Sequence, residues 1–148
     1  MDILEIKDLE TLAQKRVPKM FFDYVNSGSW TETTYNENVS DFQKIKLRQR
    51  VAIDMSNRTL ATKMVNQSVS MPVAIAPTGL TGMQRADGEI LAAQAAEEFG
   101  IPFTLSTMSV CSIEAVAEKT KKPFWFQLYV MKDKKFMARL IDRAKEAK

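Results

Sequence analysis

The stretch IPFTLSTMSVCSIEAVAEKTKKPFWFQLYV, residues 101–130, decides the fold because it joins two apolar runs through a helical segment. IPFTLST (101–107) and PFWFQLYV (123–130) are short and apolar, which is typical of buried strands. Between them, SIEAVAEKT (112–120) has the apolar spacing of a helix, with Ser112 as its N-cap. A strand, a helix and a second strand predict a parallel pair with a right-handed crossover.

The same pattern continues on both sides of this stretch. MPVAIAPT (71–78) predicts an earlier strand, and ADGEILAAQAAEEFG (86–100) predicts a helix that begins at Asp87 and stops at Gly100. KDKKFMARLIDRAKEAK (132–148) predicts a third helix, capped by its aspartate. The apolar stripes expected on the three helices are Leu91, Ala95 and Phe99; Ile113, Val116 and Ala117; and Phe136, Leu140 and Ala144. Three strand-helix units predict an α/β fold with a parallel sheet.

The first 70 residues have a different texture. PKMFFDYVNSG (18–28) predicts a helix with proline in its first turn, and the polar TETTYNENVSDFQ (31–43) is helical or irregular. KIKLRQRV (44–51) alternates basic and mostly apolar residues, which predicts a strand with one wet face. That basic face is either solvated or binds phosphate. The texture separates residues 1–70 from the strand-helix units of residues 71–148, which the family resemblance described below identifies as an extension and the first βα units.

Composition places the chain among soluble globular proteins and limits its partners. It has 148 residues, 45% hydrophobic and 26% charged, and its net charge is +3, with 21 basic residues dispersed among 18 acidic ones. Nucleic acid is therefore not expected as a partner. The start, MDILEIKDLE, is not a secretory signal, and no run approaches the roughly 18 apolar residues of a spanning helix. We expect a cytoplasmic protein, with peripheral contact at the inner face of the membrane left open.

The sequence contains no histidine and a single cysteine, Cys111. Histidine is the usual general base near neutral pH and the commonest metal ligand, so this chain lacks both devices. One cysteine excludes an intrachain disulfide, and without a histidine base Cys111 is not expected to be a nucleophile. No metal site is predicted.

Polar residues mark the carboxyl ends of the three expected strands, where parallel α/β folds bind their ligands. These ends are Pro77-Thr78-Gly79, Ser106-Thr107 and Gln127 to Tyr129. Gln127 lies on the face of its strand opposite Phe124 and Phe126, and a buried amide requires a partner in the protein or in a ligand.

The other polar positions each have a structural explanation beside a functional one. The loop APTGLTGM matches no phosphate-binding pattern, so its glycines serve either turn geometry or a close approach to a ligand. Ser106 satisfies backbone groups at a helix entry or contacts a ligand. Tyr24 and Tyr129 either place a hydroxyl at the rim of the core or bind a substrate.

Taken together, these segments resemble the amino-terminal part of the FMN-dependent α-hydroxy acid oxidase and dehydrogenase family, which includes glycolate oxidase, mandelate dehydrogenase and L-lactate dehydrogenase. The matching segments are KRVPKMFFDYVNSGSWTE, KIKLRQRV, MPVAIAPTGLTGM, DGEILAAQAAEEFGIPFTLSTMSVCSIEAVA and PFWFQLYVMKD. The resemblance covers essentially the whole chain. It implies a (β/α)8 TIM barrel with FMN across its mouth, of which this chain supplies an amino-terminal extension and about three βα units.

The resemblance also implies which residues bind the cofactor. Pro77, Thr78 and Gly79 match the first-strand segment whose backbone lies against the flavin near its reactive nitrogen. Ser106 matches a second-strand hydroxyl that contacts FMN. Gln127 matches a third-strand amide that bonds the polar edge of the isoalloxazine ring.

For the substrate, Tyr24 matches the tyrosine that binds the carboxylate, and Tyr129 matches the active-site tyrosine beside the substrate. The implied reaction oxidises a small L-2-hydroxy acid by hydride transfer to FMN while a histidine removes the hydroxyl proton. LRQRV, TLSTMSVCSIE and PFWFQLYV are similar to bacterial L-lactate dehydrogenases, which favours L-lactate and pyruvate. Because the histidine is absent, we expect no catalytic residue in this chain and no activity from it alone.

Partners and acceptor follow from the same resemblance. Family oxidases commonly have alanine at the position of Gly79 and several dehydrogenases have glycine, which favours a quinone or cytochrome acceptor over oxygen. A homo-oligomer is expected at full length, and the helical pattern at the end of the sequence is typical of a truncated protein. The alternative is a natural half-barrel or a non-catalytic flavin- or ligand-binding module that needs a partner chain. A flavodoxin-like domain is disfavoured because no phosphate-cradling loop is present.

Overall fold

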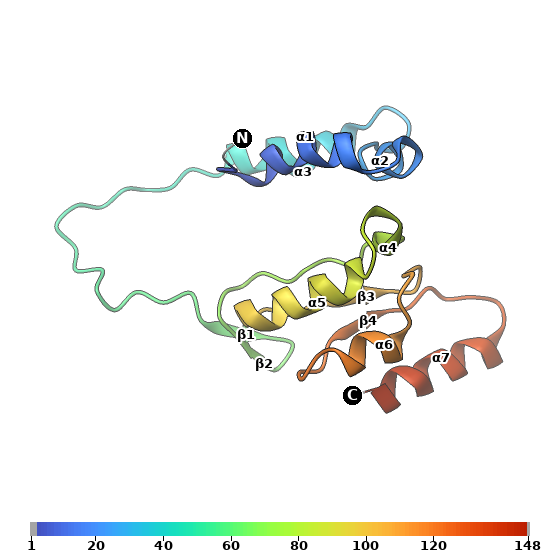
Figure 1. The fold of residues 1–148 in the computed structure, drawn as a ribbon. Helices are drawn as coiled ribbons and strands as arrows, with labels where there is room; N and C mark the ends of the chain where they lie inside the picture. The colour runs from blue at the N-terminus through green and yellow to red at the C-terminus, as the bar shows by residue number, and fades with distance from the viewer. Residues whose placement is uncertain (1–2, 148) are drawn as a thin grey trace. The chain divides into compact units, whose positions relative to one another are not determined.

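The computed structural model describes residues 3–147 and divides the chain into two compact units between Arg58 and Thr59. Figure 1 traces both units, and each is described by itself. Among the described residues, no helix is long and apolar enough to cross a membrane.

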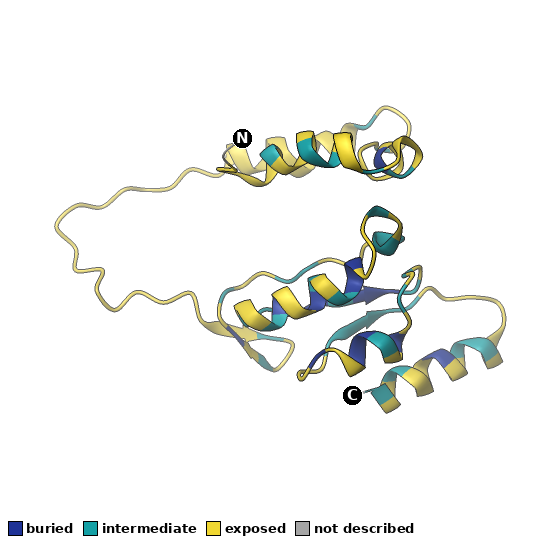
Figure 2. Ribbon diagram, viewed as in Figure 1, coloured by how far each residue is buried: buried dark blue, intermediate teal, exposed yellow. Residues whose placement is uncertain are grey.

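The N-terminal unit is helical. It contains α1 (Ile6–Arg16), α2 (Lys19–Val25), α3 (Thr33–Ser40) and the 3-10 helix η1 (Asp41–Lys44). The helix predicted from Pro18 is confirmed as α2, which has that proline as its N-cap. Phe22 is the one buried residue among residues 3–58, so most of this unit is yellow or teal in Figure 2.

The strand predicted over residues 44–51 is wrong. Lys44 ends η1, and residues 45–51 form no strand. Both alternating faces are exposed, with Leu47 at 94% and Val51 at 81%. A segment with an alternating sequence forms a strand only where one of its faces packs against the protein and a neighbouring strand accepts its backbone hydrogen bonds. Neither condition is met by residues 45–51.

The second unit begins with an antiparallel hairpin that the sequence analysis did not predict. β1 (Thr62–Met64) pairs with β2 (Gln67–Val69), and Val65 and Asn66 turn the chain with positive φ angles of 45° and 63°. Two-residue hairpin turns need positive φ, which Asn tolerates better than β-branched Val. The turn was missed because the usual Asn-Gly or Asp-Gly signal is absent.

The predicted parallel pair is confirmed. β3 (Thr104–Ser106) pairs with β4 (Trp125–Gln127), with Ser106 opposite Gln127. The first predicted strand is reduced to one parallel bridge, between Ile75 and Phe103. Proline has no N–H to donate, and Pro72 and Pro77 flank that bridge, which explains why the ladder there is short.

Four helices follow the strand segments: α4 (Thr81–Gln84), α5 (Gly88–Phe99), α6 (Ile113–Glu118) and α7 (Lys134–Ala147). Two predicted caps are confirmed, because Ser112 Oγ accepts from Ala115 N at 3.1 Å and Asp133 Oδ1 accepts from Phe136 N at 3.0 Å. Gly100 ends α5 in the left-handed region, with φ 70°. Asp87 occupies the N-cap position of α5 without a side-chain capping bond.

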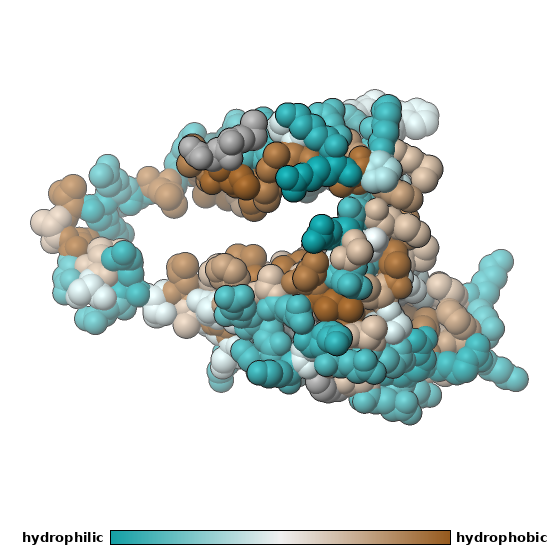
Figure 3. Space-filling view, viewed as in Figure 1, coloured by the Kyte–Doolittle hydropathy of each residue, from teal (hydrophilic) through white to brown (hydrophobic). Residues whose placement is uncertain are grey.

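The core lies between the β3–β4 sheet and the helices α5 and α6, as the dark blue segments of Figure 2 show. Its buried residues are Ala93, Ala96, Phe103, Leu105, Ile113 and Val116. The stripe predicted on α5 is wrong, because Leu91 and Phe99 are 46% and 65% exposed. The alanines face the core instead, and their small side chains let the helix approach the sheet closely. Large apolar side chains therefore remain on the surface (Figure 3).

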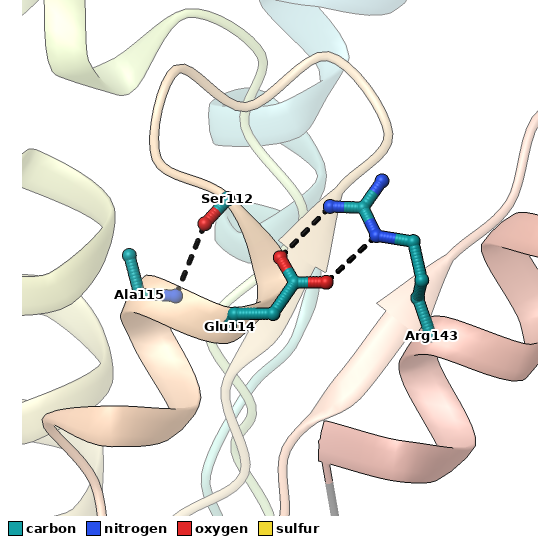
Figure 4. A network of polar contacts seen from close by, with 4 residues as sticks. All are labelled: Ser112, Glu114, Ala115 and Arg143. Atoms are coloured by element: carbon teal, nitrogen blue, oxygen red, sulfur yellow. Dashed lines mark hydrogen bonds and ion pairs between the residues drawn. The ribbon is translucent and has the colours of Figure 1, made fainter.

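An ion pair joins α6 to α7 (Figure 4). Arg143 donates from Nε and Nη2 to the two carboxylate oxygens of Glu114, at 2.7 and 2.8 Å. These bonds lower the pKa of Glu114 from 4.5 to about 2. Both side chains remain about half exposed, at 45% and 47%, so solvent screens the pair.

We expect Glu114→Gln to lower the free energy of unfolding by about 0.2 to 1 kcal/mol at pH 7. Because folding lowers the pKa of Glu114, the contribution is complete above about pH 4.5 and is lost as the pH falls towards 2. Urea unfolding at pH 7 and at about pH 2.5 measures this change. Glu118→Gln, on the exposed face of the same helix, is the control. A difference between Glu114→Gln and wild type that does not shrink at low pH would contradict the assignment.

Candidate functional site

The carboxyl ends of β3 and β4 hold a hydrogen-bonded pair, Ser106 and Gln127. Ser106 is buried at 3% exposure, and its Oγ donates to Gln127 Oε1 at 3.2 Å. Thr107 N donates to the same oxygen at 3.4 Å. With the carbonyl oxygen held in this way, Gln127 Nε2 has no hydrogen-bond partner among residues 3–147. Gln127 is half-buried, Ser106 is the protein partner of its side-chain oxygen, and its amide N–H groups are available to a ligand.

Thr107 continues the connection past the last paired residues. Its hydroxyl donates to the backbone oxygen of Gln127 and accepts from Tyr129 N at 3.1 Å. This bridge fixes the backbone that carries Tyr129, whose side chain is 53% exposed. Sequence reasoning placed Thr107 at a strand end but gave it no role, because a side-chain to backbone bridge leaves no sequence pattern.

The loop after the first strand segment rests on the loop after β3. Leu80 N donates to Met108 O at 2.9 Å, and Met108 N donates to Ser106 Oγ at 3.0 Å. A Cβ on Gly79 would lie 3.3 Å from Met108 Cβ, so the glycine allows the close approach of these loops. Met108 therefore links the Gly79 loop to the Ser106–Gln127 pair.

The predicted cofactor residues thus come together. Pro77 and Thr78 are exposed, Gly79 is half-buried, and this backbone lies in the loop joined through Met108 to Ser106. Tyr24 lies on α2 in the N-terminal unit and is 61% exposed. Its place beside the other site residues stays a prediction.

Two further polar groups lie near these loops. Cys111 is half-buried, and burial together with the neighbouring Glu89 carboxylate raises the pKa of its thiol, which disfavours a thiolate nucleophile. Sequence reasoning missed Glu89, a buried acid in the first turn of α5. The available signal was an acidic residue two positions after the N-cap, on a helix whose stripe was assigned to the wrong face. Among residues 3–147, no cluster of histidine, cysteine and acidic residues suits a metal ion.

This donor set fits the ring of a flavin. An amide with free N–H groups suits the carbonyl and nitrogen acceptors along the polar edge of an isoalloxazine, and the exposed backbone of Pro77 and Thr78 suits its flat face. The fit covers the ring only, since no phosphate-binding loop is present in the sequence.

Comparison with known proteins agrees with this chemistry. Residues 13–148 match the FMN-dependent dehydrogenase family, and the chain belongs to that family. FMN is the cofactor of the family. The predicted family resemblance is thereby confirmed.

Particular relatives define the match further. The chain is 52% identical over 140 residues to an L-lactate dehydrogenase of Acinetobacter baumannii, and 51% identical over 140 residues to an L-lactate dehydrogenase of Pseudomonas putida. Each alignment covers 95% of this chain and 37% of the relative, so the chain spans little more than a third of their length.

Solved structures give the fold. A soluble mutant of the membrane-associated (S)-mandelate dehydrogenase from Pseudomonas putida superposes with a TM-score of 0.92 at 35% identity, over 99% of this chain and 42% of that one. A monotopic membrane (S)-mandelate dehydrogenase gives 0.92 at 34% identity, over 100% and 39%. The predicted partial (β/α)8 barrel is confirmed, and residues 3–147 do not close a barrel by themselves.

Proposed function

We propose that the protein carries the FMN-binding first units of an enzyme that oxidises an L-2-hydroxy acid, with L-lactate as substrate and pyruvate as product. The observation that carries the proposal is the Ser106–Gln127 pair, which holds the amide oxygen and leaves its N–H groups available beside the Gly79 loop. Identity above 50% to two L-lactate dehydrogenases supports lactate as the substrate.

Each residue then has a defined task. Gln127 donates to the polar edge of the ring, and Ser106 and Thr107 N keep its oxygen turned away from that edge. Gly79 lets its loop approach Met108 closely, and the backbone of Pro77 and Thr78 in that loop takes the ring face. FMN, when bound, supplies the acceptor for the hydride that leaves the α-carbon of the substrate.

The substrate is held and deprotonated by separate groups. We assign the hydroxyls of Tyr24 and Tyr129 to the substrate, with Tyr24 on the carboxylate. As the α-carbon loses hydride, the hydroxyl proton must pass to a base so that the carbonyl can form. With no histidine in these 148 residues, we place that base in a part of the enzyme outside them.

Gly79 supports a quinone or cytochrome as the electron acceptor, since several dehydrogenases of the family have glycine where its oxidases commonly have alanine. The monotopic membrane structure among the neighbours supports peripheral membrane contact. We place the enzyme in the cytoplasm, with that contact at the inner membrane face. We also expect the full-length enzyme to be a homo-oligomer, which size-exclusion chromatography with light scattering measures.

A chimera tests the proposal. Residues 1–148 replace the matching amino-terminal part of the Acinetobacter baumannii L-lactate dehydrogenase, which completes the barrel with a relative 52% identical in that part. We expect the purified chimera to bind FMN, to be reduced by L-lactate in preference to L-mandelate, and to pass electrons to a soluble quinone faster than to oxygen. The parent dehydrogenase is the control.

Two outcomes would contradict the proposal. A folded chimera that binds FMN but is reduced by neither acid would favour the non-catalytic binding module. Faster reduction by L-mandelate than by L-lactate would show that the substrate is assigned wrongly, while leaving the reaction class in place.

A further inference from the structure

Glu89 lies in the first turn of α5 and is 2% exposed, which is unusual for a charged side chain. Burying a carboxylate without compensating hydrogen bonds costs several kcal/mol, so the contacts of this group decide its role. No lysine or arginine pairs with it among the residues that the structure describes.

The Glu89 carboxylate lies beside the thiol of Cys111 and accepts hydrogen bonds from backbone amides of two different loops. Its Oε1 accepts from Gly82 N at 3.0 Å and from Val110 N at 2.9 Å. Gly82 lies in α4, which follows the Gly79 loop, and Val110 lies between β3 and α6. One carboxylate oxygen therefore spans the first two βα loops.

The charge is retained in this buried place. Burial raises the pKa of Glu89, but the N–H groups of Val110 and Gly82, together with the thiol of Cys111, outweigh burial, and the pKa lies below its ordinary value. The group is therefore ionised near neutral pH. Hydrogen bonds to a charged acceptor are about twice as strong as bonds between neutral groups, so the link between the loops is a firm one.

Two glycines near the Glu89 carboxylate have no room for a side chain. A Cβ on Gly82 would lie 2.6 Å from Val110 Cβ and 3.0 Å from Glu89 Oε2, and a Cβ on Gly88 would lie 2.9 Å from Thr81 O. These distances are shorter than van der Waals contact. The corner formed by Gly82, Gly88, Glu89 and Val110 is thus closely packed around Glu89, whose Oε2 is buried without a hydrogen-bond partner among residues 3–147.

The two loops are joined at two points. Leu80 N donates to Met108 O at the end beside Ser106, and Glu89 joins Gly82 to Val110 at the other end. With one point removed, the Gly79 backbone would be free to pivot about the other. Its position relative to Ser106 and Gln127 depends on both.

We propose that Glu89 is a positioning residue that ties the first two βα loops together and thereby sets the surface on which the flavin ring lies. The two hydrogen bonds that join the loops belong to this chain by itself, whereas their effect on FMN binding rests on the function proposed above. Glu89 acts through the backbone of both loops.

The test uses the chimeric holoenzyme with Glu89→Ala and Glu89→Gln. Alanine removes the acceptor, whereas glutamine keeps a carbonyl oxygen that both amides can reach. For Glu89→Ala we expect the FMN dissociation constant to rise by about 10- to 100-fold, as loss of hydrogen bonds to a charged group implies, together with a shifted visible flavin spectrum. Glu89→Gln should restore both readouts to within about threefold of wild type in affinity.

Two controls separate positioning from lost stability. Glu98→Ala changes an exposed acid of the same helix, and Ala96→Gly loosens the buried face of α5 away from both loops. We expect neither control to change the affinity for FMN or the flavin spectrum, although Ala96→Gly lowers the unfolding midpoint. Amide hydrogen exchange should speed up selectively at Gly82 and Val110 in Glu89→Ala.

The outcomes distinguish this proposal from the proposed function. If the wild-type chimera binds no FMN, the proposed function fails. Amide hydrogen exchange at Gly82 and Val110 then tests by itself whether Glu89 joins the two loops. If the wild-type chimera binds FMN, the FMN affinity and the flavin spectrum of Glu89→Ala are decisive. Values equal to those of wild type, or equal to those of Ala96→Gly at the same loss of stability, would show that Glu89 does not position the loops.

Discussion

L-lactate added anaerobically to the 148-residue chain, with its FMN content measured, is expected to leave the flavin oxidised, while the chimera is reduced under the same conditions. The reason is the missing base: general base catalysis contributes about 10²- to 10⁴-fold, and no histidine is present to supply it. We therefore expect a rate at least about 100-fold below that of the chimera. The absorbance of oxidised flavin in a stopped-flow instrument measures both rates.

The contrary result would be informative. Flavin reduction by the chain alone, at a rate near that of the chimera, would mean that an acid, lysine or tyrosine of this sequence takes the hydroxyl proton. A chain that binds no FMN cannot be scored, so the flavin content is measured before substrate is added, and the chimera supplies the positive control.

Substitution of Gln127 is expected to weaken FMN binding in the chimera by about 10- to 100-fold, which corresponds to the loss of one or two hydrogen bonds from its half-buried amide. Gln127→Glu is the sharper variant. It keeps an oxygen that accepts from Ser106 Oγ and Thr107 N but removes the N–H donors. Titration with FMN, followed by quenching of flavin fluorescence, measures the affinity.

Gln94→Leu is the matched control. Gln94 Nε2 donates to Lys119 O at 3.1 Å on the surface of α5, and the substitution removes a hydrogen bond donated by the same kind of side-chain amide. Its affinity for FMN should equal that of wild type. If Gln127→Glu binds FMN as wild type does, the role of Gln127 is limited to joining β3 to β4, and the flavin edge is held by other groups.

Local chemistry made much of this fold predictable. Ser112, Asp133 and Gly100 each mark a helix end through a capping bond or a left-handed backbone, which depends on neighbouring residues only. The apolar runs around β3 and β4 predicted a parallel pair because a helix of suitable length separates them. The ends of these strands in turn located Ser106 and Gln127.

Features that depend on distant partners were not predictable. Residues 44–51 alternate as a strand does, but no neighbouring strand exists in the described chain to complete one. On α5, Leu91 and Phe99 outrank alanine in hydrophobicity, yet close packing against the sheet selects Ala93 and Ala96. Glu89 escaped notice for the same reason, since only the approach of two loops reveals its partners.

The packing around Glu89 also limits how this lineage of enzymes can diverge. At Gly79 a single methyl group would meet Met108 at 3.3 Å, a contact that a few tenths of an ångström of movement relieves. At Gly82 and Gly88 the same methyl would collide with neighbours at 2.6 and 2.9 Å. A larger residue at position 79 therefore requires only a small shift of Met108, whereas a side chain at Gly82 or Gly88 requires the two loops to be rebuilt.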